Sequence, residues 1–438
     1  MKTKSILLSI ILTAMMTSCV KDSSVFRLET EPFNGAKVHI DDEYFACWDD
    51  EDVIQVNGRE YTVEVDAHSA SISNVLTAKG YYAVYPAEIV SAGGFRGATY
   101  DICLPAVQYY GDNPDRQKVV APMVAAVKQG GGTLSFHNLT ALISINVTND
   151  LPEPFTVRTV TVSAPSDKIL GGYGHIYDME GVPYINYDPG ETFSSVALYC
   201  GKNGVTLAPG ETRPFYVSIP EVARVKLTVT VSDGNKGLSR SRSSQATYLR
   251  NNIYGVPFKL SGSDEKVYTS NRFHYTTVTG EPMGLDYRGP DNAYLTDPSW
   301  GAVLISDDYQ DGVGELWFDN DITSIADMAF LQHDELATIE FPANLKRIGA
   351  GAFQSCENLA RVSIPATITS VGDYAFRECY SLMEVYCYAS RPPSSGTDIF
   401  YNVGWGCVLH VPRGRANVYN SNDEWSSYYN FWDVIADL

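Results

Sequence analysis

A 23-residue repeat near the C-terminal end constrains the fold more than any other feature of this chain. Apolar residues of one kind recur at this spacing in five separate registers. They are Phe330, Phe353 and Phe376; Ile325, Ile348 and Val371; Ala329, Ala352 and Ala375; Leu336, Leu359 and Leu382; and Ile339, Val362 and Val385. A period of roughly 20 to 29 residues is typical of short units that stack and share one core, so the repeat predicts a solenoid.

The strand-forming half of each repeat has the spacing of a leucine-rich repeat. Leu359, Val362 and Ile364 fit the L-x-x-L-x-L pattern. The Ile-Gly-x-x-Ala-Phe half that begins at Ile348, together with Ile364-Pro365, resembles the BspA-like repeat of bacterial surface proteins. The resemblance covers about residues 267–438 and implies a short leucine-rich repeat solenoid.

The repeats also set the expected extent of the solenoid. Residues 316–318 and 409–411 continue the strand positions at either end, which gives five stacked strands in a row ~20–25 Å long. Solenoid ends need caps. We therefore predict a linker and N-terminal cap over residues 262–315, and BspA-like leucine-rich repeats with a C-terminal cap over residues 316–438.

The first residues have the composition of an export signal. Lys2 and Lys4 precede an apolar run that is shorter than the ~20 residues needed to span a bilayer. Together with Cys19, the segment resembles a lipoprotein signal peptide covering residues 1–18, which implies lipid attachment at Cys19. The alternative is an ordinary cleaved signal. Lys21 and the acid after it resemble a surface-export signal, which implies a lipid-anchored protein of the outer membrane, exposed on the cell surface.

Length and charge limit the remaining possibilities. A chain of 438 residues exceeds the ~250–300 residues at which single cores stop growing, so several domains are expected. The 52 acidic residues outnumber the 32 basic ones and give a net charge of −20, which repels phosphate backbones and predicts no nucleic-acid partner. Eight cysteines are too few for a disulfide scaffold. The small and polar residues 261–266 suit a domain boundary.

The segment before this boundary is expected to be β-rich, so the fold class is mainly β. Alternating strand-like patterns occur at residues 62–65, 142–147, 157–162 and 225–231, with turn residues between them. Short strands at such spacing favour β-sandwiches. We predict two sandwich subdomains, over residues 19–148 and 149–261.

Several short motifs then follow one another in a fixed order, at residues 48–56, 80–87, 104–109, 121–125, 134–139 and 249–254. This order resembles the fimbrillin family of pilus subunits and surface lipoproteins, which implies a fimbrillin-like β-sandwich pair and a role in pilus building or surface display. Polymerising members are cut after an arginine in a loop, and strand insertion follows. The early arginine here, Arg27, lies in an expected strand rather than in a loop, which speaks against such processing and polymerisation.

Catalytic and metal-binding motifs are missing from the sequence. It has no nucleophile elbow, zinc-protease helix motif, phosphate-binding loop or C-x-x-C, and its seven histidines lack ligand spacing. The segment from Asp307 to Gly312 has Phe318 where a calcium loop needs glutamate. Cys356 and Cys379 share one repeat position, which favours buried thiols, with a disulfide as the alternative. We expect no enzyme activity, no metal and no cofactor.

The solenoid strands supply the candidate binding residues. Since side chains alternate along a strand, the residue between two inward positions faces outward on the concave face. This rule gives a ligand-binding row made of Trp317, Glu340, Ser363, Tyr386 and His410, with Tyr388 beside it. Exposed aromatic side chains are strong contact residues and can stack on sugars. The alternative is that a cap covers Trp317 and that the insertion at Pro392-Pro393 covers Tyr386.

Together these features predict a cell-surface lipoprotein for adhesion or recognition that presents a leucine-rich repeat head on a fimbrillin-like base. The expected partners are a host or bacterial surface protein or glycan, other fimbrial subunits, and the outer membrane through the lipid anchor. The alternatives are a pilus tip or accessory subunit, or a glycan-capture component of an outer-membrane uptake system.

Overall fold

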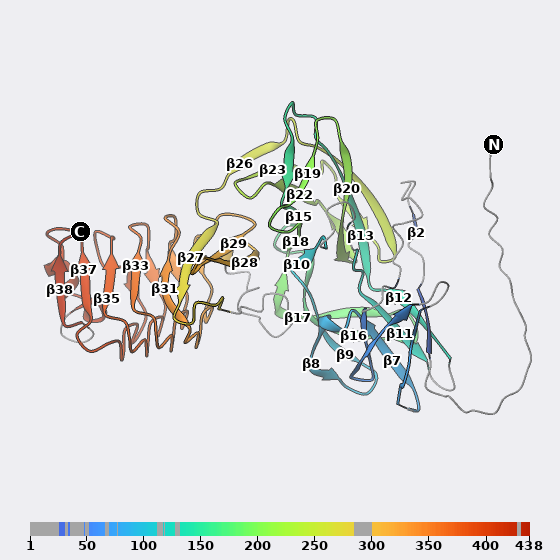
Figure 1. Cartoon of the computed structure of the whole chain (residues 1–438), viewed down its shortest axis with the longest axis horizontal. Coiled ribbons are helices and arrows are strands. Elements are labelled where there is room, and N and C mark those ends of the chain that lie inside the picture. The colour runs from blue at the N-terminus through green and yellow to red at the C-terminus, as the bar shows by residue number, and fades with distance from the viewer. Residues whose placement is uncertain are drawn as a thin grey trace, which may run out of the picture.

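The computed structural model describes residues 26–30, 34–35, 48, 52–65, 70–76, 78–111, 117, 119–127, 132–283, 300–426 and 431–438. The predicted export signal and Cys19 lie outside these residues. Figure 1 shows a β-rich N-terminal body from which a row of stacked strands extends to one side and ends at the C-terminus. The predicted mainly β fold is confirmed. In the described part of the chain, no helix has the length and apolar character needed to cross a membrane.

Two sheets form the first sandwich. The strands of the larger sheet are β1 (Phe26–Thr30), β3 (Val53–Val56), β4 (Arg59–Thr62), β5 (Glu64–Val65), β6 (Ala70–Ile72), β7 (Tyr81–Tyr85), β11 (Met123–Val127) and β12 (Thr133–Asn138), in the order β4-β3-β7-β11-β12-β1-β6-β5. The strands of the smaller sheet are β8 (Val90–Phe95), β9 (Tyr100–Leu104), β16 (Gly171–Tyr177) and β17 (Tyr184–Phe193), in the order β17-β16-β9-β8. The 3-10 turn η1 (Ala87–Ile89) connects β7 to β8. Val84 and Val124 pack against Ile102 and Ile176 in the core between the sheets.

The second sandwich is built in the same way. Its six-stranded sheet contains β10 (Val107–Tyr109), β15 (Thr159–Ser163), β18 (Ser195–Tyr199), β22 (Thr228–Ser232), β23 (Lys236–Ser241) and β26 (Asp264–Val267), in the order β10-β18-β15-β22-β23-β26. Its four-stranded sheet contains β2 (Asn34–Gly35), β13 (Thr140–Thr148), β20 (Thr212–Pro220) and β25 (Asn252–Lys259), in the order β2-β25-β13-β20. Two strand pairs complete it, β14 (Phe155–Val157) with β19 (Val205–Leu207), and β21 (Val222–Val225) with β24 (Ala246–Tyr248).

The two sandwiches exchange strands. The β16–β17 hairpin lies between β15 and β18 in the sequence, yet β16 pairs with β9 of the first sandwich. Strand β10 comes directly after β9 and pairs in parallel with β18 of the second sandwich. Neither sandwich is therefore made from one continuous half of the N-terminal module, and the chain crosses between the two several times.

The repeat domain has a long sheet on one side and a line of short strands on the other. The long sheet contains β27 (Arg272–Thr277), β28 (Leu304–Gln310), β29 (Val313–Phe318), β31 (Leu336–Glu340), β33 (Arg361–Ile364), β35 (Glu384–Cys387), β37 (Val408–Val411) and β38 (Asp433–Ala436), in the order β28-β29-β27-β31-β33-β35-β37-β38. The short strands are β30 (Ser324–Ile325), β32 (Arg347–Ile348), β34 (Ser370–Val371) and β36 (Ser394–Ser395). The helix α1 (Ala416–Asn420) and the 3-10 turn η3 (Asp423–Trp425) lie at the C-terminal end.

The parallel stack begins later than the sequence predicted. Residues 316–318 lie in β29, which is antiparallel to β27, and β27 separates β29 from the first parallel strand, β31. The expected first rung is thus the middle of an antiparallel cap. Phe273 and Tyr275 of β27 are buried and belong to the same core as the repeats. The antiparallel cap of β27, β28 and β29 can therefore close this end of the stack. At the other end β38, expected within the cap, forms the fifth parallel strand.

A column of phenylalanine rings runs through the repeat core. Phe330, Phe353, Phe376 and Phe400 stack with centroid separations of 5.0, 5.2 and 5.4 Å, and all are fully buried. The thiol of Cys356 donates a hydrogen bond to the carbonyl oxygen of Phe330 (3.0 Å), and the thiol of Cys379 donates one to that of Phe353 (3.1 Å). Both cysteines are buried free thiols, as the repeat position indicated.

Glycine recurs after the short strands because adjacent repeats touch there through their backbones. A Cβ atom at Gly349 would lie 2.5 Å from the carbonyl carbon of Ala326, and one at Gly372 would lie 2.5 Å from the amide nitrogen of Ala350. Both distances are far inside van der Waals contact. The Ile-Gly pair of the repeat is therefore a packing requirement of the stack.

Candidate binding surfaces

The outer face of the long sheet carries most of the predicted row. Strand register places Glu340 beside Ser363, Ser363 beside Tyr386, and Tyr386 beside His410. The residues on either side of them in the strands, such as Val362 and Val385, are buried in the core. The row continues to Ile435 on β38.

An aromatic stack lies at the C-terminal end of this row. The rings of Tyr386 and His410 are nearly parallel, with centroids 4.4 Å apart. The hydroxyl of Tyr386 donates to a Glu384 oxygen (3.1 Å), and Nδ1 of His410 lies 3.0 Å from an Asp437 oxygen. Partial desolvation and the neighbouring Glu384 carboxylate raise the pKa of Tyr386. The stack therefore combines flat apolar faces with hydrogen-bond acceptors at their edges, and Tyr388, 46% exposed, lies near the end of the same strand.

Trp317 does not lie on the exposed face, contrary to the sequence-based expectation. Its side chain points to the outer side of β29, but the second sandwich covers it, and it is only 1% exposed. The ring packs against Tyr199 with centroids 5.8 Å apart, and the Arg158 guanidinium carbon lies 4.8 Å above it. Val107, Ala197 and Ile305 complete this junction cluster. Trp317 connects the two parts of the protein and is unavailable to a ligand.

Two exposed tryptophans were not predicted. Trp405 is 86% exposed and Trp432 is 66% exposed, and their rings meet edge to face with centroids 5.2 Å apart. The amide of Trp432 donates to the Cys407 carbonyl oxygen (2.7 Å), which holds it just before β38. Neither tryptophan occupies one of the five repeat registers, so a search by register passes over them. The sequence signal for them is composition, because tryptophan is rare in this chain and concentrated near its end.

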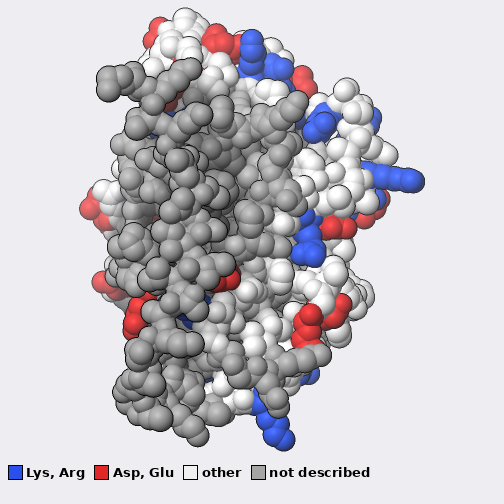
Figure 2. Space-filling model, turned by 90° about the vertical axis from the view of Figure 1, so that its right-hand side faces the viewer, with Lys and Arg blue, Asp and Glu red and all other residues white. Residues whose placement is uncertain are grey.

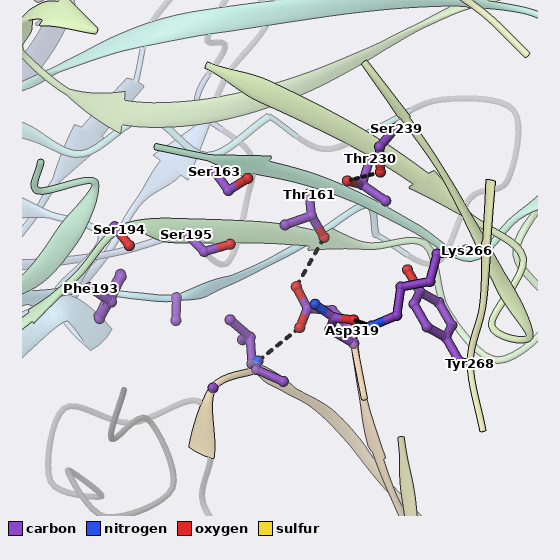
Figure 3. Close-up of a pocket in the computed structure, with 15 residues that line it drawn as sticks. Thr161, Ser163, Phe193, Ser194, Ser195, Thr230, Ser239, Lys266, Tyr268 and Asp319 are labelled. Carbon is purple, nitrogen blue, oxygen red and sulfur yellow. Dashed lines mark hydrogen bonds between the residues drawn. The ribbon is translucent and has the colours of Figure 1, made fainter. Parts of the chain in front are cut away.

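A cavity of about 320 Å³ lies where the repeat domain meets the second sandwich (Figure 3). Its floor is the outer face of the six-stranded sheet, where Thr161 and Ser163 of β15 lie beside strands β18 and β22. Its walls include Val303 and Asp319 from the repeat domain and Tyr268 from the linker that precedes β27. This pocket has no counterpart among the sequence predictions, because it requires both modules.

Asp319 is the charged group of this cavity that is most removed from water. Its carboxylate accepts hydrogen bonds from the Val303 amide (2.8 Å) and the Thr161 hydroxyl (3.2 Å). Burial raises the pKa of Asp319 to about 6, although these hydrogen bonds favour the ionised form. Burial also raises the pKa of Tyr268 to about 12. The junction is therefore expected to respond to mild acid.

Asp319→Asn should remove a pH dependence of stability. The pKa is about 6 in the folded protein and 3.8 as the model value, so the aspartate stabilises the fold fully below about pH 4 and loses that contribution as the pH rises through 6. The loss amounts to about 3 kcal/mol. Asparagine does not ionise, and its Oδ1 can accept from the Val303 amide while its Nδ2 donates to the Thr161 hydroxyl oxygen. The free energy of unfolding of both proteins should be measured between pH 4 and 7.5. The value for the variant should rise relative to that of the parent up to about pH 6.5. A difference in unfolding free energy that stays constant with pH would contradict an elevated pKa of Asp319.

Metal coordination finds no support among the described residues, where no group of three or more His, Cys, Asp or Glu side chains is placed to hold an ion. The segment from Asp307 to Gly312 forms the end of β28 and the tight turn into β29.

Figure 2 shows the face of the N-terminal module opposite the repeats, where basic and acidic residues of the described surface are interspersed rather than gathered by sign.

Comparison with known families identifies the repeats. Residues 309–405 match the family described as "BspA type Leucine rich repeat region (6 copies)". This part of the chain is similar to BspA-type leucine-rich repeats. The matched residues include Tyr386 and Trp405, whereas His410 and Trp432 follow the match in the part of the chain that continues the same sheet and core. No curated protein matches the chain.

Solved structures similar to this chain include fimbrial and candidate cell adhesion proteins. A candidate cell adhesion protein from Bacteroides uniformis is 14% identical, with 56% of this chain and 94% of that chain covered and a TM-score of 0.33. A fimbrial protein from Bacteroides ovatus is 11% identical, with 58% and 52% covered and a TM-score of 0.27. The C-terminally truncated tip fimbrial protein Mfa3 from Porphyromonas gingivalis is 9% identical, with 56% and 97% covered and a TM-score of 0.25. At such low scores, the function has to be inferred from the residues of this chain.

Proposed function

We propose that this protein is a cell-surface adhesion or recognition protein that acts by binding rather than by catalysis. The β-sandwich module serves as the base, and the leucine-rich repeat domain presents the binding surface. The observation that carries this proposal is the gathering of exposed aromatic side chains in the last repeats. Tyr388, Trp405 and Trp432 are exposed there. The two tryptophans pack together just before β37 and β38, and Tyr386 stacks on His410 within β35 and β37.

The location of these residues supports the proposal. Figure 1 shows that the last repeats lie at the end of the molecule farthest from the N-terminal module, where a partner can approach without meeting the base. Contiguous exposed apolar side chains mark interaction sites more often than single ones do, and Trp405 and Trp432 form such a contiguous pair. Tryptophan and tyrosine also dominate measured interface energies.

We further propose that Cys19 attaches the protein to the outer membrane through lipid, with the leucine-rich repeat domain turned outward. The resemblance of residues 1–18 to a lipoprotein signal supports this arrangement. Three acyl chains on one cysteine would exceed the two-signal threshold for stable membrane attachment. The partner would then be a protein or glycan on a host or bacterial surface.

The structure gives a specific reason to rank this role above assembly into a pilus shaft by cleavage at Arg27. Strand β1 lies inside its sheet, pairing with β12 on one side and β6 on the other, and the Arg27 amide donates to the Gly132 carbonyl oxygen (2.8 Å). A protease would have to pull this strand out before reaching the bond. A role as a pilus tip or accessory subunit, which needs no such cleavage, stays the second candidate.

The double change Trp405→Ala and Trp432→Ala should reduce adhesion at least tenfold, which corresponds to about 1.4 kcal/mol. Both side chains are exposed, so the melting temperature should stay the same. The assay is binding of cells displaying the full chain to arrays of glycans and of host and bacterial surface proteins.

Cys19→Ala should abolish cell adhesion by moving the protein out of the membrane fraction.

The matched control is Tyr177→Ala with Tyr184→Ala. These two tyrosines also form an exposed aromatic pair, with centroids 5.7 Å apart, but they belong to the first sandwich. Adhesion should survive in this control. Full adhesion by the tryptophan variant, with its fold verified, would show that the last repeats are not the binding surface.

A further inference from the structure

The cavity between the second sandwich and the leucine-rich repeat domain has the chemistry of a binding site, and it is separate from the aromatic surface of the last repeats. Strand register aligns hydroxyl side chains across its floor. Ser195 lies opposite Ser163, Thr161 lies opposite Thr230, and Thr230 lies opposite Ser239. Five hydroxyls on four adjacent strands therefore face one space (Figure 3).

The hydroxyls differ in how far they are already satisfied. The hydroxyls of Thr230 and Ser239 are 2.8 Å apart and bond to each other, and Thr161 donates to Asp319. Ser194 and Ser195, at the other end, have no side-chain hydrogen bond to any described residue, and Figure 3 shows them beside Phe193. This end of the cavity therefore offers free donors and acceptors next to an aromatic ring.

The charges in the cavity wall are already compensated. The Lys266 ammonium lies 3.2 Å from an Asp321 oxygen and 5.7 Å from the centre of the Tyr268 ring. Both Asp319 oxygens accept hydrogen bonds from the protein. An ionic ligand would have to displace one of these partners, whereas a neutral ligand would not. Ala106, Ala302 and Val303 add apolar wall.

We propose that this cavity binds one neutral sugar residue, either a free monosaccharide or the terminal unit of a glycan. Sugar hydroxyls are donors and acceptors that match serine and threonine, and the apolar face of a sugar ring packs on an aromatic ring such as Phe193. A volume of about 320 Å³ is at the lower end of the range for small-molecule pockets, so it suits a single ring. Because its walls come from both modules, the bound sugar would also hold the leucine-rich repeat domain against its base.

The test is titration of the full chain with D-glucose, D-galactose, D-mannose, L-fucose and N-acetyl-D-glucosamine, followed by saturation-transfer NMR and calorimetry. At least one sugar should bind, and Ser163→Val with Ser195→Val should weaken that binding at least tenfold. Valine suits a strand, removes the hydroxyl and narrows the cavity. Methyl glycosides of the bound sugar distinguish the two sources, because only a site for glycan ends accepts the added group.

The matched control is Thr156→Val with Thr206→Val, a bonded hydroxyl pair (2.9 Å) on β14 and β19 of the same sandwich, outside the cavity. It should bind sugar as the parent does. Failure of all five sugars to bind, or equal binding by the serine variant, would overturn the proposal. Loss of sugar binding in the Trp405 and Trp432 variant alone would also overturn it, by placing the sugar on the adhesion surface. Neither cavity result depends on whether the last repeats mediate adhesion.

Discussion

Phe353→Ala should destabilise the leucine-rich repeat domain by about 3 to 5 kcal/mol. Phe353 is fully buried and stacks between Phe330 and Phe376, with centroid separations of 5.0 and 5.2 Å. Alanine would leave a void in the middle of this column, and the rings on either side are held by their own repeats and cannot close it. Each repeat is stabilised mainly by its neighbours, so the damage should spread along the stack.

Scanning calorimetry is the measurement for this variant, and Tyr388→Ala is its control. Tyr388 is an exposed aromatic residue of the same domain, so its removal should leave the repeat transition in place. In the Phe353 variant the melting temperature of the repeat domain should fall by roughly 10 °C, while the melting temperature of the sandwich module should stay the same. An unchanged transition would contradict the stacking of the repeats through this column.

Trp317→Ala should release the leucine-rich repeat domain from its base, at a cost of about 3 to 5 kcal/mol. The indole contacts Tyr199 and lies under Arg158, and it is the largest member of the small cluster that joins the two modules. On the neighbouring strand positions, Leu316 and Phe318 face the repeat core instead. The cap should therefore stay folded while the contact between the modules is lost.

Small-angle scattering should show a larger radius of gyration for the Trp317 variant, and proteases should cut the newly exposed linker near residues 261–271. Trp432→Ala removes the same kind of side chain from an exposed position, so it should change neither the radius of gyration nor the protease sensitivity of the linker. A compact Trp317 variant would mean that the remaining contacts suffice. Those contacts include the Thr161–Asp319 hydrogen bond and the Asn271 side chain, which donates to the Gly234 carbonyl oxygen (3.3 Å).

The inward half of the repeat domain could be predicted from the sequence because a stack imposes one environment on every repeat. Ile339, Val362 and Val385 share a register and are buried together. Cys356 and Cys379 follow the same rule, which explains thiols that resemble a reactive pair in the sequence but donate to backbone carbonyl oxygens of the preceding repeat. The repeat period and the apolar character of each repeat position can be read from a single segment, so the sequence is sufficient to predict which repeat residues are buried.

The junction could not be predicted in this way, since it depends on contacts between segments far apart in the chain. Nothing near Trp317 indicates that Tyr199 and Arg158 cover it. The insertion of β27 between β29 and β31 likewise depends on pairing across the segment between residues 277 and 304. Trp405 and Trp432 were missed for a different reason, because they stand in parts of the last repeats that depart from the 23-residue pattern.

The backbone contacts at Gly349 and Gly372 have a consequence for how such a protein can change its reach. Each repeat rests on the one before it through the same close approach, so a further 23-residue unit could be inserted between them without altering either end. Each insertion would move the exposed tryptophans outward by ~4.8 Å and leave the junction with the base untouched. Duplication of whole repeats would therefore change how far the exposed tryptophans stand from the base without changing the surface that they form.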